Sequence, residues 1–212
     1  PNYTGKPPVM LAGLRPGEAS PASATIAVPA GSQLVIRSSG NVHFDVAHKG
    51  GLEPVPEDGR TPLPAGSEER RFTIKGDGSA ALQGIAGSDL AWTFTAIPDR
   101  APTISLLHDP ERQARGSLRL DYRMEDDYGV IEAHAEFALK DDESPAGAHP
   151  LFKAPEFPLT LPQLRTRSGA AQTTRDLSDN PWAGAEVTVS LTAKDEAGNV
   201  GKSEPRELTL PQ

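Results

Sequence analysis

Strict alternation of apolar and polar residues is the feature that most limits how this chain can fold. The segment 118–124 reads LRLDYRM, and 131–140 and 186–193 repeat the alternation with few errors. Successive side chains of a β-strand point to opposite faces, so the pattern predicts strands with one buried and one solvated face. The second half of the chain is therefore expected to form sheets that cover a common core.

The rest of the sequence also favours short strands over helices. The 20 glycines and 21 prolines interrupt any helical period, and no window of eleven or more residues keeps one. Further strand candidates are 9–11, 25–28, 34–38, 42–46, 71–75, 80–83, 91–97 and 103–107. Many short strands separated by turn residues predict an all-β sandwich fold.

A domain boundary is expected near residue 98. A strand candidate ends at Ile97, and Pro98 and Pro102 enclose a short polar link before the next apolar run. We therefore predict two tandem immunoglobulin/fibronectin-like β-sandwiches in an elongated arrangement, covering 1–98 and 99–212.

Charge and cysteine content exclude several classes of partner and chemistry. The net charge of −8 argues against nucleic acid or an anionic membrane surface as the main partner. The absence of cysteine excludes disulfides, thiolate metal sites and cysteine nucleophiles. No nucleophile elbow or phosphate-binding glycine loop occurs either, so we predict no enzymatic activity and no cofactor. No stretch of the sequence is apolar enough for a membrane span, so an anchor is expected elsewhere in a longer protein.

Two long loops are predicted, at 48–69 and 141–158, and each contains four prolines. Loops of this length are often functional, and Phe152 and Phe157 make the second one a possible docking site; the alternative is a polyproline-like excursion without a partner. The sequence 76–78, Gly-Asp-Gly, is typical of a hairpin turn.

Acidic residues gather in segments that a sandwich topology would bring to one end of the second domain, beside the linker. Oxygen ligands from three segments suit calcium, so the sequence predicts a candidate calcium site there. Its ligands would be Asp99, Glu125, Asp126, Asp127, Asp195 and Glu196.

A metal-free alternative explains the same residues. Arg100, Arg123, Lys194 and Lys202 lie in or beside these segments and can balance most of the negative charge. Asp, Asn and Gly also favour tight turns for local reasons. A salt-linked junction without metal is therefore the default interpretation of these residues, and the calcium site is the alternative.

The two tryptophans are expected to serve the core. Trp92 alternates with Phe94 in a strand candidate, which is typical of a buried face. Trp182 precedes the strand candidate 186–193 and is interpreted as a plug at the end of the core, with a sugar-stacking platform as the alternative.

Several turns and strand ends resemble one protein family. The segments 120–122, 126–130, 181–184 and 193–199, with the opening Tyr-Thr-Gly-Lys-Pro-Pro, are similar to long alphaproteobacterial proteins of domain-of-unknown-function family 4175. The similarity extends over nearly the whole chain. It implies an N-terminal anchor in the inner membrane and a periplasmic body of immunoglobulin-like modules. The family has no established activity, so the resemblance implies no functional residues.

Three functions agree with these features. The first is a non-enzymatic extracytoplasmic spacer or protein-interaction segment of a membrane-anchored bacterial envelope protein, with a protein partner in the envelope. The second is a calcium-dependent adhesin-like rod that uses the acidic junction. The third is a glycan-binding appendage of an envelope enzyme, which would need exposed aromatic side chains.

Overall fold

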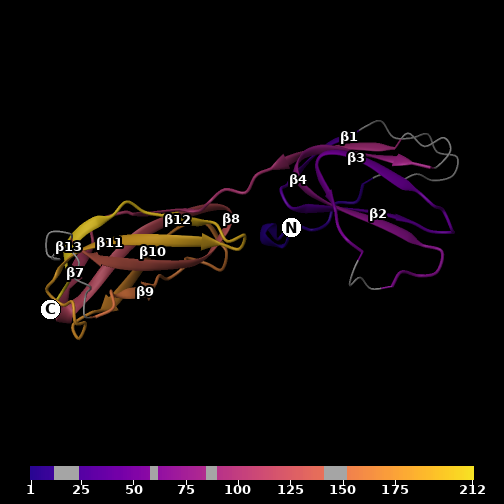
Figure 1. The fold of residues 1–212 in the computed structure, drawn as a ribbon. Helices are drawn as coiled ribbons and strands as arrows, with labels where there is room; N and C mark the ends of the chain where they lie inside the picture. Colours follow the sequence, from indigo (N-terminus) through magenta and orange to yellow (C-terminus); the bar gives the residue numbers. More distant parts are fainter. Residues whose placement is uncertain (12–23, 58–61, 85–89, 141–151) are drawn as a thin grey trace, which may run out of the picture. The chain divides into compact units, whose positions relative to one another are not determined.

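The structure, a computed structural model, describes residues 1–11, 24–57, 62–84, 90–140 and 152–212. Within these ranges β-strands are the main regular structure, beside two short 3-10 segments (Asn2–Thr4 and Ala114–Gly116), and the chain divides into two compact units, Pro1–Asp99 and Arg100–Gln212 (Figure 1). The division lies one residue after the boundary expected from the sequence. None of the helical segments described has the length and apolar character to cross a bilayer.

Five strands build unit 1, the segment Pro1–Asp99. They are β1 (Ala24–Pro29), β2 (Ser32–Ser38), β3 (Asp45–Pro54), β4 (Glu68–Gln83) and β5 (Ala91–Ile97). Their order is β1-β5-β4-β2, and β3 pairs with β4. The β1–β5 pair is parallel and the other pairs are antiparallel.

Glycines allow the β3–β4 ribbon to bend midway. The register between the two strands shifts between Gly50 and Leu52, opposite the segment 74–78. An added Cβ on Gly51 would lie 2.5 Å from the backbone of Gly76, so the two backbones approach too closely for any side chain there. The prediction of a hairpin turn at 76–78 is therefore wrong, because this segment lies inside the continuous strand β4.

The bend lets the two halves of β4 join different neighbours around one core. Residues 68–74 pair with β2, and 78–81 pair with β5. The buried core of unit 1 consists of Leu34, Leu52, Phe72, Ile74, Ala80, Leu90, Trp92 and Phe94. Burial of Trp92 and Phe94 confirms the interpretation of 91–97 as a half-buried strand.

Two predictions for unit 1 are corrected. Residues 9–11 form no strand. The segment 48–69 is not one long loop, because 48–54 belong to β3 and 68–69 to β4. Glycine and proline concealed the strand character of 48–54, while pairing with β4 satisfies its backbone. Residues 58–61 of this segment lie outside the described residues.

Unit 2, the segment Arg100–Gln212, is organised around one very long strand. Its strands are β6 (Thr103–Leu106), β7 (Glu111–Gln113), β8 (Ser117–Leu139), β9 (Glu156–Pro158), β10 (Thr166–Asp176), β11 (Glu186–Asp195), β12 (Val200–Lys202) and β13 (Arg206–Thr209). The first half of β8 pairs with β6, β7 and β10. Its second half pairs with β9 and β11, and β11 pairs in turn with β12 and β13.

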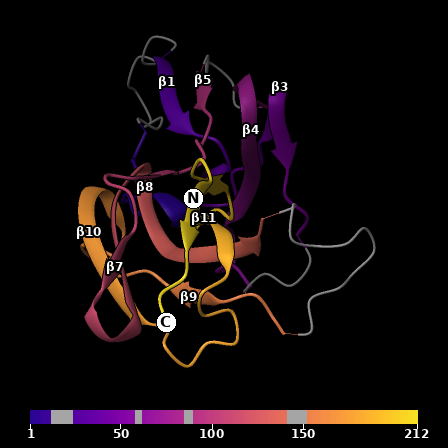
Figure 2. The same cartoon turned by 90° about the vertical axis from the view of Figure 1, so that its left-hand side faces the viewer.

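Strand β8 passes from one layer of the sandwich to the other by bending near Gly129, whose φ is 112° (Figure 2). Residues 125–129 lie between the alternating segments 118–124 and 131–140, and their Asp and Gly residues favour a loop there. They instead continue the strand, because backbone pairing persists on both sides of the bend. The result is the all-β, immunoglobulin-like sandwich that the alternation predicts.

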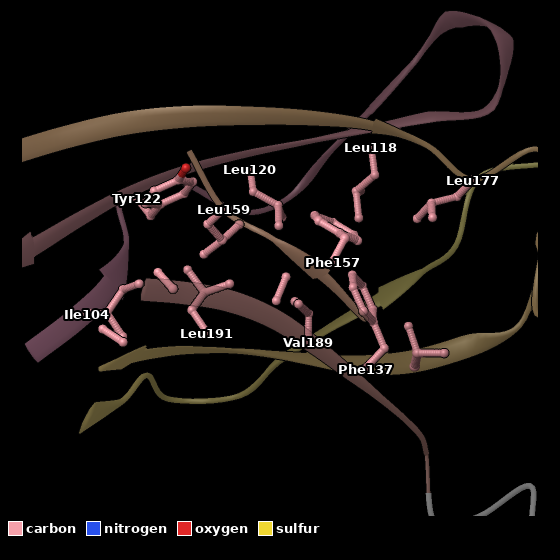
Figure 3. Packing of buried hydrophobic residues seen from close by; sticks show 14 of the residues in the cluster. Ile104, Leu118, Leu120, Tyr122, Phe137, Phe157, Leu159, Leu177, Val189 and Leu191 are labelled. Atoms are coloured by element: carbon pink, nitrogen blue, oxygen red, sulfur yellow. The ribbon is translucent and has the colours of Figure 1, made fainter. Parts of the chain in front are cut away.

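The inward side chains of the two layers meet in one core (Figure 3). Leu118, Leu120 and Tyr122 from the first half of β8 face Val189 and Leu191 of β11, and all five are fully buried. This confirms the buried faces predicted from 118–124 and 186–193. Trp182 packs into the same cluster, as expected for a core plug.

The predicted loop 141–158 is corrected at its C-terminal end. Residues 156–158 form β9, which pairs with β8, and Phe157 lies in the core beside Phe137 with ring centroids 5.7 Å apart. Phe157 therefore serves packing, whereas Phe152 is 56% exposed. Residues 141–151 lie outside the described residues.

Candidate functional site

The structure places the six acids of the predicted calcium site in different local settings. Asp99 is the last residue of unit 1, and the other five belong to unit 2. The segments 125–129 and 195–199 do meet, since Asp195 pairs in register with Val130 at the bend of β8. The sequence argument therefore located this end of the sandwich correctly.

Asp126 organises the bend with one carboxylate oxygen. Its Oδ2 accepts hydrogen bonds from the backbone N–H groups of Tyr128 at 3.1 Å and Gly129 at 2.5 Å. Burial raises the pKa of Asp126, and the nearby charges of Asp127 and Asp195 raise it further, although the two backbone hydrogen bonds oppose this shift. The group thus acts as a local brace for the bent backbone.

Protein partners already engage three of the remaining acids. Glu125 forms an ion pair with Arg123 at 3.0 Å, and Glu196 forms one with Arg165. Asp195 accepts hydrogen bonds from the backbone and side-chain nitrogens of Asn199, each at 2.8 Å. The sequence argument missed Arg165, which lies 31 residues before its partner Glu196 and carries no motif.

Among the described residues, no three His, Asp or Glu side chains lie close enough together to hold a metal ion. Two of the six acids form ion pairs, Glu125 with Arg123 and Glu196 with Arg165, whereas Asp195 is held by the neutral Asn199. Of the four cations expected to balance the acids, Lys202 pairs with Glu136 instead, and no ion pair of Arg100 or Lys194 occurs among the described residues. Calcium binding by the six acids is therefore an untested hypothesis from the sequence, and titration decides it.

The open edge of β10 is the second candidate site, and the sequence analysis did not identify it. β10 pairs with β8 along its length and ends the strand order of its sheet. Within the described ranges, no other strand or loop forms a backbone–backbone hydrogen bond with 167–175. One side of this strand therefore presents unpaired peptide groups.

The composition of this edge favours strand pairing. Residues 168–174 read SGAAQTT, without charge or proline, and span roughly 24 Å at the usual strand rise. Ser168, Ala170, Gln172 and Thr174 are exposed and small or flexible. Soluble proteins usually guard an edge strand by charge, proline or shortness. The strands β6, β7, β9, β12 and β13 are three or four residues long, whereas β10 has eleven.

The segment 160–162 closes the core beneath β10 and forms no backbone–backbone hydrogen bond with residues 167–175. The Thr160 backbone N–H donates to the Thr173 hydroxyl at 2.9 Å, and the Tyr122 hydroxyl donates to the Thr160 carbonyl oxygen at 2.7 Å. Pro162 packs against Gly169, where an added Cβ would lie 3.0 Å from the proline ring. Because residues 160–162 cover the apolar core, the outer side of β10 can lack a neighbouring strand without exposing core side chains.

A groove of about 570 Å³ continues from the C-terminal end of this edge. Pro155, Glu156 and Phe157 line one wall, and 174–181 line the other. Arg175 belongs to this second wall, and at the opposite end of the uncharged tract stands Arg167. Both arginines are exposed and neither forms an ion pair with a described residue, although the charge of Arg175 helps to lower the pKa of the adjacent Asp176.

Several solved structures are similar to this chain, all at low sequence identity. The adhesin InvE of Yersinia pseudotuberculosis is 15% identical, with a TM-score of 0.32, and the match covers 89% of this chain and 57% of the adhesin. The chicken CNTN1 FN1–FN3 domains are 12% identical, with a TM-score of 0.36, and cover 92% of this chain and 70% of their own. The I9–I11 tandem from titin is 11% identical, with a TM-score of 0.31, and covers 85% and 63%.

Comparison with protein families gives a match over the full length. No curated protein matches the chain. The model described as "Domain of unknown function (DUF4175)" matches residues 1–212, which include both units, the bend of β8 and the open edge of β10. On this match, the chain belongs to the DUF4175 family.

Proposed function

We propose that this chain is a non-enzymatic protein-interaction segment that binds its partner by adding a strand to the open edge of β10. The observation that carries the proposal is the unpaired, uncharged tract 168–174 on a strand of eleven residues. Main-chain hydrogen bonds supply affinity in strand addition, and pockets beside the edge supply specificity. The groove next to Arg175 offers such a pocket.

The rest of the architecture suits a spacer that presents this edge. Both units have their own buried cores, and rigid sandwiches hold an exposed strand in a fixed conformation. Membership in the DUF4175 family, together with the resemblance noted from the sequence, supports a place in the periplasm, tethered to the inner membrane in the full-length protein. The partner would then be another protein of the bacterial envelope.

The fold buries the two tryptophan side chains that could have stacked against a sugar in the glycan-binding alternative. Trp92 and Trp182 are both 7% exposed and pack in the cores, so neither offers a ring face to a sugar. The adhesin-like alternative depends on calcium at the six acids and is addressed by titration below.

The test is site-specific photocrosslinking in cells that express the full-length protein. A benzophenone amino acid is placed at Gln172 on β10 and, as a matched control, at Arg206 on β13, another exposed edge strand of the same unit. We expect a discrete protein adduct from Gln172 and none from Arg206. Ala170→Lys, which places a charge on the edge, should abolish the Gln172 adduct. Equal adducts at both positions, or none at Gln172, would contradict the proposal.

A further inference from the structure

We infer that the open edge of β10 selects an extended segment with an acidic residue at each end of an uncharged stretch of seven residues. The inference rests on the proposed function and adds the chemistry of the partner. Its central observation is the placement of Arg167 and Arg175 on either side of 168–174.

The spacing of the two arginines sets the spacing on the ligand. Arg167 and Arg175 are eight positions apart, and from Ser168 to Arg175 a paired strand advances one residue for each residue of β10, as β8 does. Arg167 adjoins this regular stretch at the irregularity between Thr166 and Ser168 and has no register partner on β8. An antiparallel or parallel ligand that covers the tract therefore places its flanking residues opposite these two arginines. Oppositely charged residues in facing positions stabilise strand pairing, and like charges weaken it.

Both arginines are available for this role. They are exposed, and neither forms an ion pair with a described residue. The two arginines on the adjoining half of β8 are engaged, since Arg123 pairs with Glu125 and Arg119 with Asp121. Exposed guanidinium groups can bind carboxylates in a bidentate manner, which adds geometric selectivity to the charge.

The groove beside the edge makes the two ends different. Arg175 stands in its wall together with Leu177, and Phe157 lies opposite. The same walls carry the carboxylates of Glu156, Asp176 and Asp179, so an acidic side chain gains at this end only through direct contact with the Arg175 guanidinium. Arg167 lies at the other end, where the register between β10 and β8 shifts between Thr166 and Ser168.

Charge also argues against a second copy of this chain as the occupant. An antiparallel pair of β10 strands that overlaps the two tracts completely has its two-fold axis at Ala171. That register sets Arg167 opposite Arg175 of the partner strand at both ends, which is a like-charge contact. An acid-flanked segment of another protein has no such conflict.

The test uses the 212-residue chain, labelled with ¹⁵N, and two synthetic nonapeptides. Both peptides have alternating threonine and valine at the seven central positions; one carries aspartate at each end and the other lysine. We expect the aspartate peptide to bind roughly five- to tenfold more tightly than the lysine peptide, as two facing charge pairs imply. Amide shifts should concentrate on 168–174.

Charge reversal provides the matched variant. In the double variant Arg167→Glu, Arg175→Glu the preference should invert in favour of the lysine peptide, with an unchanged melting temperature because both side chains are exposed. The variants Arg167→Gln and Arg175→Gln, tested singly, should each lose part of the preference and preserve the fold.

Three results would overturn the inference: equal affinity for the two peptides, amide shifts away from β10, or a dimer of the unliganded chain whose dissociation follows the Arg167 and Arg175 charges. The two proposals fail separately. An adduct at Gln172 without a preference for the aspartate peptide rejects only the acidic ligand, whereas absence of that adduct rejects the edge as the interaction site.

Discussion

Gly51 and Gly76 face each other where the β3–β4 ribbon bends, and only one of the two positions lacks room for a side chain. An added Cβ on Gly51 would lie 2.5 Å from the Gly76 nitrogen, whereas an added Cβ on Gly76 would lie 3.7 Å from the Gly51 Cα. The first distance is a steric clash and the second is an ordinary contact. The bend that closes the core of unit 1 therefore depends on Gly51 specifically.

Gly51→Ala should destabilise unit 1 by about 1–3 kcal/mol, because the two backbones must move apart. Gly76→Ala is the matched control and should change the free energy of unfolding by less than about 0.5 kcal/mol. Urea unfolding followed by Trp92 fluorescence measures both, in a Trp182→Phe background that removes the signal of unit 2. Equal losses for the two variants would refute the asymmetry.

Tyr122→Phe should destabilise unit 2 by about 1–2 kcal/mol, because the Thr160 carbonyl and the Thr173 hydroxyl each lose a hydrogen-bond partner. Burial raises the pKa of Tyr122 above its usual value, so its phenol should also ionise later than an exposed tyrosine as the pH rises. Thr173→Ser retains the hydroxyl and should preserve stability, while Thr173→Val should not. Trp182 fluorescence measures the unfolding of unit 2. If Tyr122→Phe leaves the free energy of unfolding unchanged, the Tyr122 hydrogen bonds do not stabilise this unit.

Glu69→Gln should reduce the acid sensitivity of unit 1 by the part that Glu69 contributes. Glu69 is 4% exposed; burial disfavours its charge, yet hydrogen bonds from Arg71 and Arg37 hold the pKa of this carboxyl below its usual range. A lowered folded-state pKa stabilises the fold above the unfolded-state pKa, and this contribution is lost as the pH falls below about 4.3 through the folded-state value.

The Glu69→Gln variant should therefore be less stable than the parent at pH 7, by about 1–2 kcal/mol. The difference should shrink as the pH falls below 4.3. Glu53→Gln removes an exposed ion pair with Lys75 and serves as the control with little expected change. A constant difference between parent and variant at all pH values would show that Glu69 does not ionise as described.

Calcium titration tests the acidic end of unit 2. We expect no binding heat at millimolar calcium and no rise in melting temperature, because Glu125, Asp195 and Glu196 already have protein partners. Asp126→Asn is the informative variant, since its Oδ1 is buried and has no hydrogen-bond partner among the described residues. If calcium produces binding heat with the parent protein and none with the Asp126→Asn variant, the calcium site exists. That result would favour the adhesin-like alternative.

Local patterns were sufficient to predict much of unit 2. Alternation in 118–124 and 186–193 predicts which side chains are buried, and those side chains meet in the core. The same alternation placed Trp92 and Phe94 inside unit 1. A strand's face depends only on the parity of neighbouring residues, which can be read without knowing the strand's partners.

The candidate sites depended on contacts between distant segments. Continuity of β8 through 125–129, the Arg165–Glu196 ion pair and the facing Gly51 and Gly76 all join residues that no local pattern connects. The open edge of β10 belongs to the same class. Its segment was not among the strand candidates, because SGAAQTT lacks the alternation of large apolar and polar residues. What makes β10 a candidate site is that only one side of the strand receives a neighbour. Alternation along the chain determines the face of a strand, whereas only the assembled sheet decides which backbone groups remain without hydrogen bonds.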